Sequence, residues 1–451
     1  MHRSQSGWVL SLLVAALTAM TLSGCGAAAT KSSTSSPAVV VDAPVQVAHT
    51  ALGDVEYRVT GSGPALVLIM GYAGTMETWD PHFVDMLARH FRVYLFDNAG
   101  TGRTASLASP LTIDAMANQT SALITELHLG SPDVLGWSMG GMIAQALAVL
   151  HPAQVHRLIL AATFPGNGNA VQPSQSDIAA LTSGNVAATQ AVLFPADQTL
   201  ADDAFSGSLD AYPASSPASA SAISGQAGAS LAWFDGRDVA GHDLSRIVVP
   251  TLVADGASDR LDAVANDREL SSLISHSKLV LYPDAGHAFL FQEGATFTFL
   301  VRTFLLGVPT PLSVAKIRQS YLTDYKVERS AGTRWVAKLK SLTSKSTPED
   351  LARIDLSLGD AVGALDDELL SFGATSNLGA AVVAYVNAEE RSLSDVLALG
   401  ALSGSTAKTY KATSARDGLA GVTLGNALRR LLNLPAISTT TTTTTLALNN
   451  L

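Results

Sequence analysis

Cysteine and positive charge are both scarce in this chain of 451 residues. A single cysteine excludes a disulfide framework within the chain. Lysine and arginine total 28 against 38 acidic residues, which gives a net charge of -10 at pH 7, and no basic run interrupts the sequence. We therefore expect no binding to nucleic acid through phosphate neutralisation and none to a membrane through a basic patch. The sequence also lacks a P-loop and any zinc-type spacing of cysteine and histidine, so we expect no cofactor and no metal.

The one cysteine, Cys25, follows an apolar stretch from Trp8 to Leu22. This stretch is short for a membrane-spanning helix and has the length of a signal-peptide core. The segment "LSGC" (22–25) resembles the lipobox of bacterial lipoproteins, in which the cysteine is acylated and becomes the first mature residue. We expect residues 1–25 to be a lipoprotein signal peptide, with the protein exported and anchored by lipid at Cys25 to the outer face of a bacterial cell membrane. A plain secretory leader is the alternative.

Residues 26–44 are rich in alanine, serine and threonine and predict a flexible linker. From residue 45 to residue 306, continuous apolar runs alternate with helical patterns. Such runs are typical of strands buried on both faces, and strands separated by helices indicate a parallel sheet. The runs are 65–70, 91–96, 132–137, 155–163, 249–255 and 277–282. The fold class predicted is α/β, a mostly parallel sheet flanked by helices.

Two regions lack this alternation of apolar runs and helical patterns. Residues 164–246 are rich in small residues but carry several aromatics, which favours a helical cap insertion over a long disordered loop. After a boundary at "GVPTP" (307–311), residues 312–435 show helical spacing, clearest at 348–372 and 417–434. We expect an all-helical C-terminal domain of three to five helices that packs on the α/β domain or binds a protein partner. Residues 436–451 form a low-complexity, threonine-rich tail.

The segment "DVLGWSMGGMIAQALAVL" (133–150) contains the motif with the clearest chemical meaning. Residues 136–140 match G-x-S-x-G, a pattern that arises easily by chance in a chain with 36 glycines. Its context is more specific, because a strand pattern precedes the motif and a helical pattern follows it. Ser138 is therefore expected on a tight strand-to-helix turn, with the first N–H groups of the helix nearby. That placement predicts a nucleophile.

A serine hydroxyl needs a base to remove its proton. Among ten histidines we select His287, because it lies in a Gly-His turn directly after the last strand pattern, where ligands bind in open α/β sheets. The carboxylate that orients this histidine would come from "VVPTLVADGASDRLD" (248–262), in which Asp255, Asp259 and Asp262 compete. Asp259 is preferred because it lies in the loop past the strand end, with Asp255 the main alternative.

The order Ser138, Asp259, His287 is the one found in α/β-hydrolases. Residues 45–306 resemble that family, in the branch of esterases and cofactor-free haloperoxidases. The resemblance is carried by "GSGPALVLIMGYAGTMETWDP", "FRVYLFDNAGTGRT" and "GWSMGGMIAQALAVLHPAQVHRLIL".

The resemblance also implies an oxyanion hole, made by the backbone N–H groups of Tyr72 and Met139. The family usually has a histidine where Met70 stands, and often an arginine and a serine where Ala99 and Thr104 stand. Because the donors are backbone groups, these departures concern the branch of the family and the supporting hydrogen bonds more than the chemistry.

The function predicted is that of a serine hydrolase, carboxylesterase- or lipase-like (EC 3.1.1), acting on an uncharged small or lipid-like ester. A serine nucleophile excludes the haloalkane dehalogenases and epoxide hydrolases of this fold, which use aspartate. Perhydrolysis, C–C bond hydrolysis and peptidase activity stay open. The alternative from another class is a surface lipoprotein whose helical C-terminal domain is a binding module, with the hydrolase domain as a scaffold or a minor activity.

Overall fold

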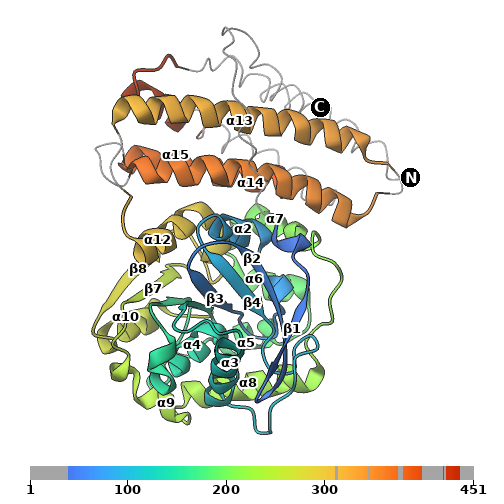
Figure 1. Cartoon of the computed structure of the whole chain (residues 1–451), viewed down its shortest axis with the longest axis vertical. Helices are drawn as coiled ribbons and strands as arrows, with labels where there is room; N and C mark the ends of the chain where they lie inside the picture. Colours follow the sequence, from blue (N-terminus) through green and yellow to red (C-terminus); the bar gives the residue numbers. More distant parts are fainter. Residues whose placement is uncertain are drawn as a thin grey trace. The chain divides into compact units, whose positions relative to one another are not determined.

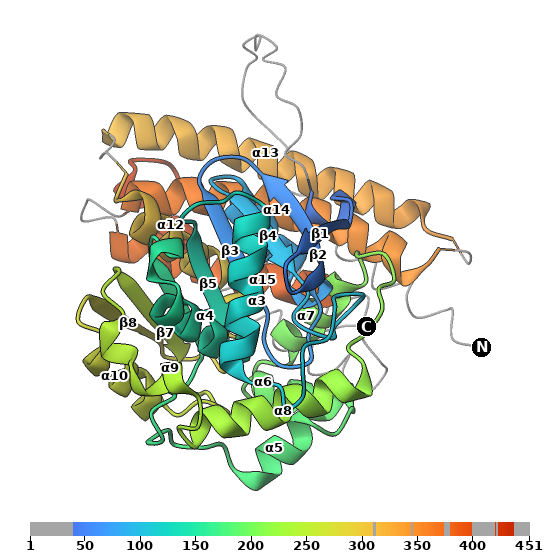
Figure 2. The same cartoon turned by 60° about the horizontal axis from the view of Figure 1, so that its bottom comes forward.

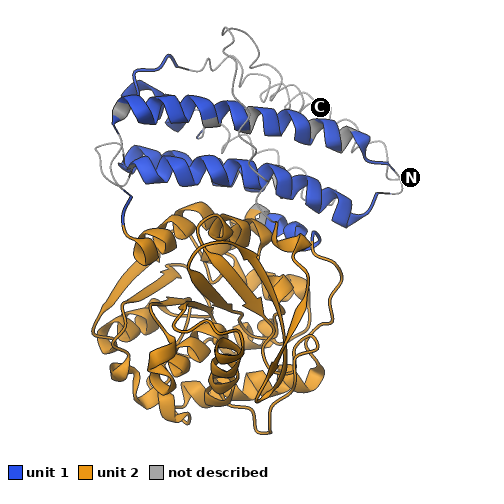
Figure 3. Cartoon of the chain, in the orientation of Figure 1, with its two compact units in different colours: residues 1–37, 203–211, 308–451 blue, residues 38–202, 212–307 orange. Residues whose placement is uncertain are grey.

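The computed structural model describes residues 39–309, 313–343, 346–373, 379–398, 420 and 423–436. The chain divides into two compact units (Figure 3), one made of residues 38–202 and 212–307, the other of residues 203–211 and the described residues from 308 onward. Cys25, the expected signal peptide and the expected threonine-rich tail lie outside the described residues. Within the described part, no helix has the length and the apolar character needed to cross a membrane.

An eight-stranded sheet lies at the centre of the first unit (Figure 1). Its order is β1-β2-β4-β3-β5-β6-β7-β8, with β1, β2 and β4 paired antiparallel and the remaining pairs parallel. The strands are β1 (Gln46–Thr50), β2 (Gly53–Gly61), β3 (Ala65–Ile69), β4 (Arg92–Phe96), β5 (Asp133–Trp137), β6 (Leu158–Ala161), β7 (Thr251–Gly256) and β8 (Ser277–Tyr282). Every residue of β5, β6 and β7 is buried, as expected for strands covered on both faces.

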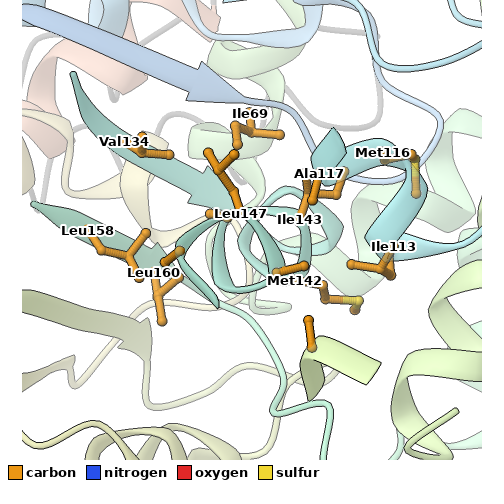
Figure 4. Close-up of a cluster of buried hydrophobic side chains, with 14 of the residues drawn as sticks. Ile69, Ile113, Met116, Ala117, Val134, Met142, Ile143, Leu147, Leu158 and Leu160 are labelled. Atoms are coloured by element: carbon orange, nitrogen blue, oxygen red, sulfur yellow. The ribbon is translucent and has the colours of Figure 1, made fainter. Parts of the chain in front are cut away.

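Helices flank this sheet, and α3 and α4 lie side by side in front of the strands in Figure 2. Ile143 and Leu147 of α4 pack among Ile69, Val134 and Leu160 of the strands (Figure 4). Burying such apolar side chains contributes about 1.5–3 kcal/mol each. The helices of the α/β unit outside the cap are α2 (Pro81–Ala88), α3 (Ile113–Glu126), α4 (Met139–Leu150), α10 (Val264–Leu273), α11 (Phe289–Gln292) and α12 (Gly294–Leu306).

The fold class predicted from the sequence is confirmed, and each of the six apolar runs contains a strand. The sequence pattern missed β1 and β2, the antiparallel hairpin at one edge, because polar and charged residues interrupt their apolar positions. The flexible linker expected through residue 44 ends earlier. Residues 40–42 form a short 3-10 helix in which Val40 and Val41 are buried, and the Val40 N–H donates to Asp85 of α2 at 2.7 Å.

The region expected to be a cap is helical. Its helices are α5 (Gln175–Leu181), α6 (Val186–Leu193), α7 (Thr199–Leu209), α8 (Ala220–Phe234) and α9 (Val239–His242). Serine and asparagine side chains accept hydrogen bonds from the first turns of α5, α6 and α8, which fixes where these helices begin. Trp233 of α8 is fully buried and donates its Nε1 hydrogen to the Phe164 carbonyl at 3.0 Å, so α8 is anchored to the α/β unit.

The helical unit beyond residue 308 contains α13 (Val314–Ser341), α14 (Pro348–Gly373) and α15 (Gly379–Leu397). Its apolar contacts include the buried Trp335, whose Nε1 donates to Asp355 Oδ1 at 2.7 Å. The N-terminus of α14 begins at Pro348, followed by two acidic residues, as the sequence pattern predicts. Residues 423–431 form a further helical segment within the stretch expected at 417–434.

Candidate active site

Ser138 lies on the turn between β5 and α4. Its backbone has φ 56° and ψ -122°, a conformation that a residue with a side chain adopts at a cost of about 1–3 kcal/mol. The Ser138 N–H donates to the Ala161 carbonyl at 2.9 Å, and its own carbonyl accepts from Gly141 at 2.9 Å and from the Thr163 hydroxyl at 2.7 Å. These contacts hold the strained turn at the carboxyl end of the sheet.

Two glycines of the motif are required by close packing around this turn. A Cβ at Gly136 would overlap the backbone of Gly140, and a Cβ at Gly140 would overlap the carbonyl of Ile69, at the end of β3. The motif therefore brings the turn directly against the loop that follows β3. Close packing therefore requires glycine at both of these positions of the motif.

His287 and Asp259 form a buried pair. His287 Nδ1 lies 2.6 Å from Asp259 Oδ2, and both side chains are almost completely shielded from solvent. The other oxygen of Asp259 accepts the backbone N–H groups of Leu261 at 2.6 Å and Asp262 at 2.9 Å. Three donors therefore fix this carboxylate, the arrangement that orients an imidazole and stabilises its charged form. Of the competing carboxylates, Asp259 is the one that contacts His287.

Trp137, the residue before the serine, connects the serine turn to the histidine loop. Its indole Nε1 donates to the His287 carbonyl at 3.0 Å, and its ring lies 5.7 Å from the imidazole ring, centre to centre. Among the described residues, no hydrogen bond joins Ser138 Oγ to the His287 ring. In free enzymes this contact is often long or poorly aligned and tightens when substrate binds. This role of Trp137 could not be inferred from the sequence.

Tyr72 and Met139, the expected oxyanion donors, lie beside Ser138 in the wall of one pocket. Met139 is the first residue of α4, whose N–H has no partner within the helix. In the described part of the chain, neither the Tyr72 N–H nor the Met139 N–H has a hydrogen-bond acceptor. Both donors are thus available to an incoming oxygen atom.

The pocket at Ser138 has about 580 Å³ of empty space, part of it open to solvent. Its walls come from the serine turn, from α4 and from the cap, and they are largely apolar. The apolar lining residues include Met139, Met142, Phe164, Ile178, Leu231 and Phe234. Among the residues that the structure describes, no lysine, arginine, aspartate or glutamate lines it, so the pocket suits an uncharged group.

A second acidic group lies next to the His287–Asp259 pair. Asp255, Asp262 and Asp267 are fully buried, and their carboxylate oxygens lie within 4.8 Å of one another. Burial raises the pKa of Asp267 to about 7, and burial together with the neighbouring carboxylates raises the pKa of Asp255 and of Asp262 well above their usual range. The spacing would fit a metal ion, and a proton shared between Asp255 and Asp267 would instead satisfy one oxygen of each of these two carboxyl groups.

A sequence model described as the alpha/beta hydrolase fold matches residues 64–294, slightly more than half of the chain. The chain belongs to the alpha/beta hydrolase fold family. Its membership agrees with the order of the candidate residues and supports an enzyme of the hydrolase type. The matched segment contains Ser138, Asp259 and His287, and it ends before α13, α14 and α15.

Individual relatives and solved structures also match part of the chain. The chain is 28% identical over 262 residues to a protein named "Putative carbamate hydrolase RutD" from Caulobacter sp. (strain K31), an alignment covering 56% of this chain and 96% of the relative. It is 41% identical over 108 residues to a "Putative non-heme bromoperoxidase BpoC" from Mycobacterium tuberculosis, covering 24% and 41%. An "alpha/beta hydrolase fold protein from Chitinophaga pinensis" superposes with a TM-score of 0.53 at 26% identity, over 59% of this chain and 98% of that one.

Proposed function

We propose that this protein is a serine hydrolase that cleaves ester bonds of uncharged, modestly apolar substrates through an acyl-enzyme. The observation that carries the proposal is the buried His287–Asp259 pair, 2.6 Å apart, joined through Trp137 to a strained serine turn that opens into an apolar pocket. A strained serine with no base nearby would be a structural feature only. A base and its orienting carboxylate beside it form a set of groups suited to acyl transfer.

In the first step, His287 removes the Ser138 proton as the oxygen attacks the ester carbonyl carbon. The carbonyl oxygen becomes an oxyanion and accepts hydrogen bonds from the Tyr72 and Met139 N–H groups, each worth about 10²–10³ in rate. Asp259 holds the imidazole in the tautomer that accepts the proton and stabilises the imidazolium. Collapse of the intermediate returns that proton to the leaving alcohol and leaves Ser138 acylated.

In the second step, water attacks the acyl-enzyme with His287 as its general base, which releases the carboxylic acid and restores the Ser138 hydroxyl. The apolar wall formed by Phe164, Leu231 and Phe234 would receive the acyl or alcohol group. A charged group there would lose its hydration without gaining a partner. The substrate is accordingly an uncharged ester.

The test is hydrolysis of p-nitrophenyl esters of increasing acyl length by the wild type and by Ser138→Ala. Removal of the nucleophile of a working triad costs about 10⁶ in kcat, so turnover should fall to background in the variant. Ser224→Ala, a change at an exposed position of α8, is the matched control and should leave turnover unchanged. Turnover that persists in Ser138→Ala would refute the assignment.

The names of the relatives suggest one further substrate class for the same assay. Carbamates place a carbonyl between an oxygen and a nitrogen, and the same serine and oxyanion donors would act on it. Faster turnover of a neutral aryl carbamate than of the matching ester would move the proposal from esters to carbamates. Faster turnover of the ester would support the proposal as stated.

A further inference from the structure

The loop that supplies Tyr72 is held at both ends by buried side-chain amides. It comprises residues 70–73, after β3, and packs against the serine turn so closely that a Cβ at Gly71 would lie 3.2 Å from Ser138 Cβ. At its start, Asn98 Nδ2 donates to the Met70 carbonyl at 2.8 Å. At its end, the Ala73 N–H donates to Gln226 Oε1, also at 2.8 Å. The loop therefore has one hydrogen bond on each side of Tyr72.

Gln226 belongs to α8 of the cap, 153 residues away from Ala73 in the sequence. Its side chain is fully buried, and its Nε2 donates to Thr101 Oγ1 at 3.2 Å. The orientation of the amide follows from chemistry, because a backbone N–H only donates and so must face the oxygen of the glutamine. Thr101, itself fully buried, then fixes the other half of the amide.

The hydrogen bond from Ala73 to Gln226 supports a strained part of the backbone. Its φ of 59° lies in the left-handed region, which residues other than glycine adopt only when their surroundings impose it. The peptide preceding Ala73 carries the N–H that Gln226 binds, and it joins Ala73 to Tyr72. A rotation at Ala73 would thus turn the residue whose N–H is the proposed oxyanion donor.

We propose that Gln226 is a positioning residue, which holds the oxyanion loop in register with Ser138 and couples it to the cap. This rests on the proposed function of the site. The same helix carries Ala227, Ser230, Leu231 and Phe234 in the pocket wall. One helix thus contacts the substrate and fixes the loop that stabilises the transition state, so a displacement of α8 acts on binding and on rate together.

Gln226→Leu removes the amide while keeping a side chain of similar length. Loss of a whole oxyanion donor costs about 10²–10³ in kcat, so a misaligned donor should cost roughly 10- to 100-fold, with little change in KM. Gln226→Glu keeps an acceptor oxygen toward Ala73, and the Thr101 hydroxyl can rotate to donate to the other oxygen. This variant should recover most of the lost kcat. Ser224→Ala on the same helix is the control.

Two readouts separate positioning from a general weakening of the cap. The inhibition constant of a trifluoromethyl ketone, which occupies the oxyanion site after Ser138 adds to it, should rise in Gln226→Leu by the same factor by which kcat/KM falls. Hydrogen exchange should speed up in residues 70–74, with the exchange of α4 unchanged.

The exchange measurement needs no turnover, so it tests the hydrogen bond even if the wild type hydrolyses no ester and the proposed function fails. Unchanged exchange in residues 70–74 of Gln226→Leu would overturn the proposal. So would equal loss of kcat in the leucine and glutamate variants, since the acceptor oxygen would then be irrelevant.

Discussion

The carboxyl end of the sheet and the cap meet at Ser138, yet they are built in different ways. At the sheet end, the serine turn and the His287–Asp259 pair follow directly from strands and are fixed by hydrogen bonds shorter than 3.1 Å. The cap contributes mostly apolar side chains to the pocket, and Gln226 of α8 connects it to the oxyanion loop through a hydrogen bond from the Ala73 N–H. The candidate catalytic residues are thus held in place at the ends of strands, whereas the cap determines which molecule reaches them.

After the loss expected for Ser138→Ala, the largest effect is expected from a change at Asp259 on the sheet side. Asp259→Asn cannot accept the His287 N–H in the same way and favours the wrong tautomer, so kcat should fall by about 10⁴. Asp255→Asn is the matched control, because Asp255 lies four residues earlier at the end of β7 and, in the described part of the chain, forms no hydrogen bond with His287. Its kcat should stay within a few-fold of the wild type. Steady-state kinetics on one ester decides, and equal losses in both variants would contradict the assignment of Asp259.

A smaller effect is expected on the cap side. Ala227→Leu adds three carbon atoms to the pocket wall on α8. The pocket then loses room for one or two methylene groups of the acyl chain. We therefore expect kcat/KM for octanoyl esters to fall about tenfold relative to acetyl esters. Gly228→Ala, at the next position, where an added Cβ meets no neighbouring atom, is the control. An unchanged acyl-length profile in Ala227→Leu would mean that the acyl chain lies elsewhere.

The smallest effect is a change in thermal stability. It concerns the buried acidic group of Asp255, Asp262 and Asp267 beside the His287–Asp259 pair. Burial raises the pKa of Asp267 from 3.8 to about 7. Between these values the folded protein holds a proton that the unfolded chain has lost, so the contribution of Asp267 to stability falls as the pH rises from about 4 to about 7. Asp267→Asn should therefore raise Tm by a few degrees at pH 8 and by less at pH 5. Thermal unfolding at both pH values measures this, and a variant that is less stable at pH 8 would contradict it.

The strands on the sheet side could be predicted because each is a continuous apolar run followed by a turn rich in glycine. Ser138 and His287 could be selected from such positions, and Asp259 could be preferred over Asp255 because it lies past the strand end. The structure adds the reason, since Asp259 alone of the three candidates accepts a hydrogen bond from His287.

The cap was predicted only as a helical insertion. Its helices are rich in alanine, serine and glycine, so the sequence carries little periodicity from which to infer their packing. Gln226 could not be selected from the sequence, because its partner Ala73 is 153 residues away and a glutamine in a helix is ordinarily exposed. The supporting hydrogen bond from Asn98 was missed for a similar reason, since its partner Met70 lies 28 residues away in the sequence.

The proposed function requires Ser138 to be an activated nucleophile. A fluorophosphonate probe, which phosphonylates such serines, should be added to the folded protein and the adduct located by peptide mass spectrometry. We expect one adduct, on Ser138, that is lost when the protein is unfolded before treatment and that forms much more slowly in His287→Ala. Absence of an adduct on the folded protein, or an adduct on another serine, would contradict it.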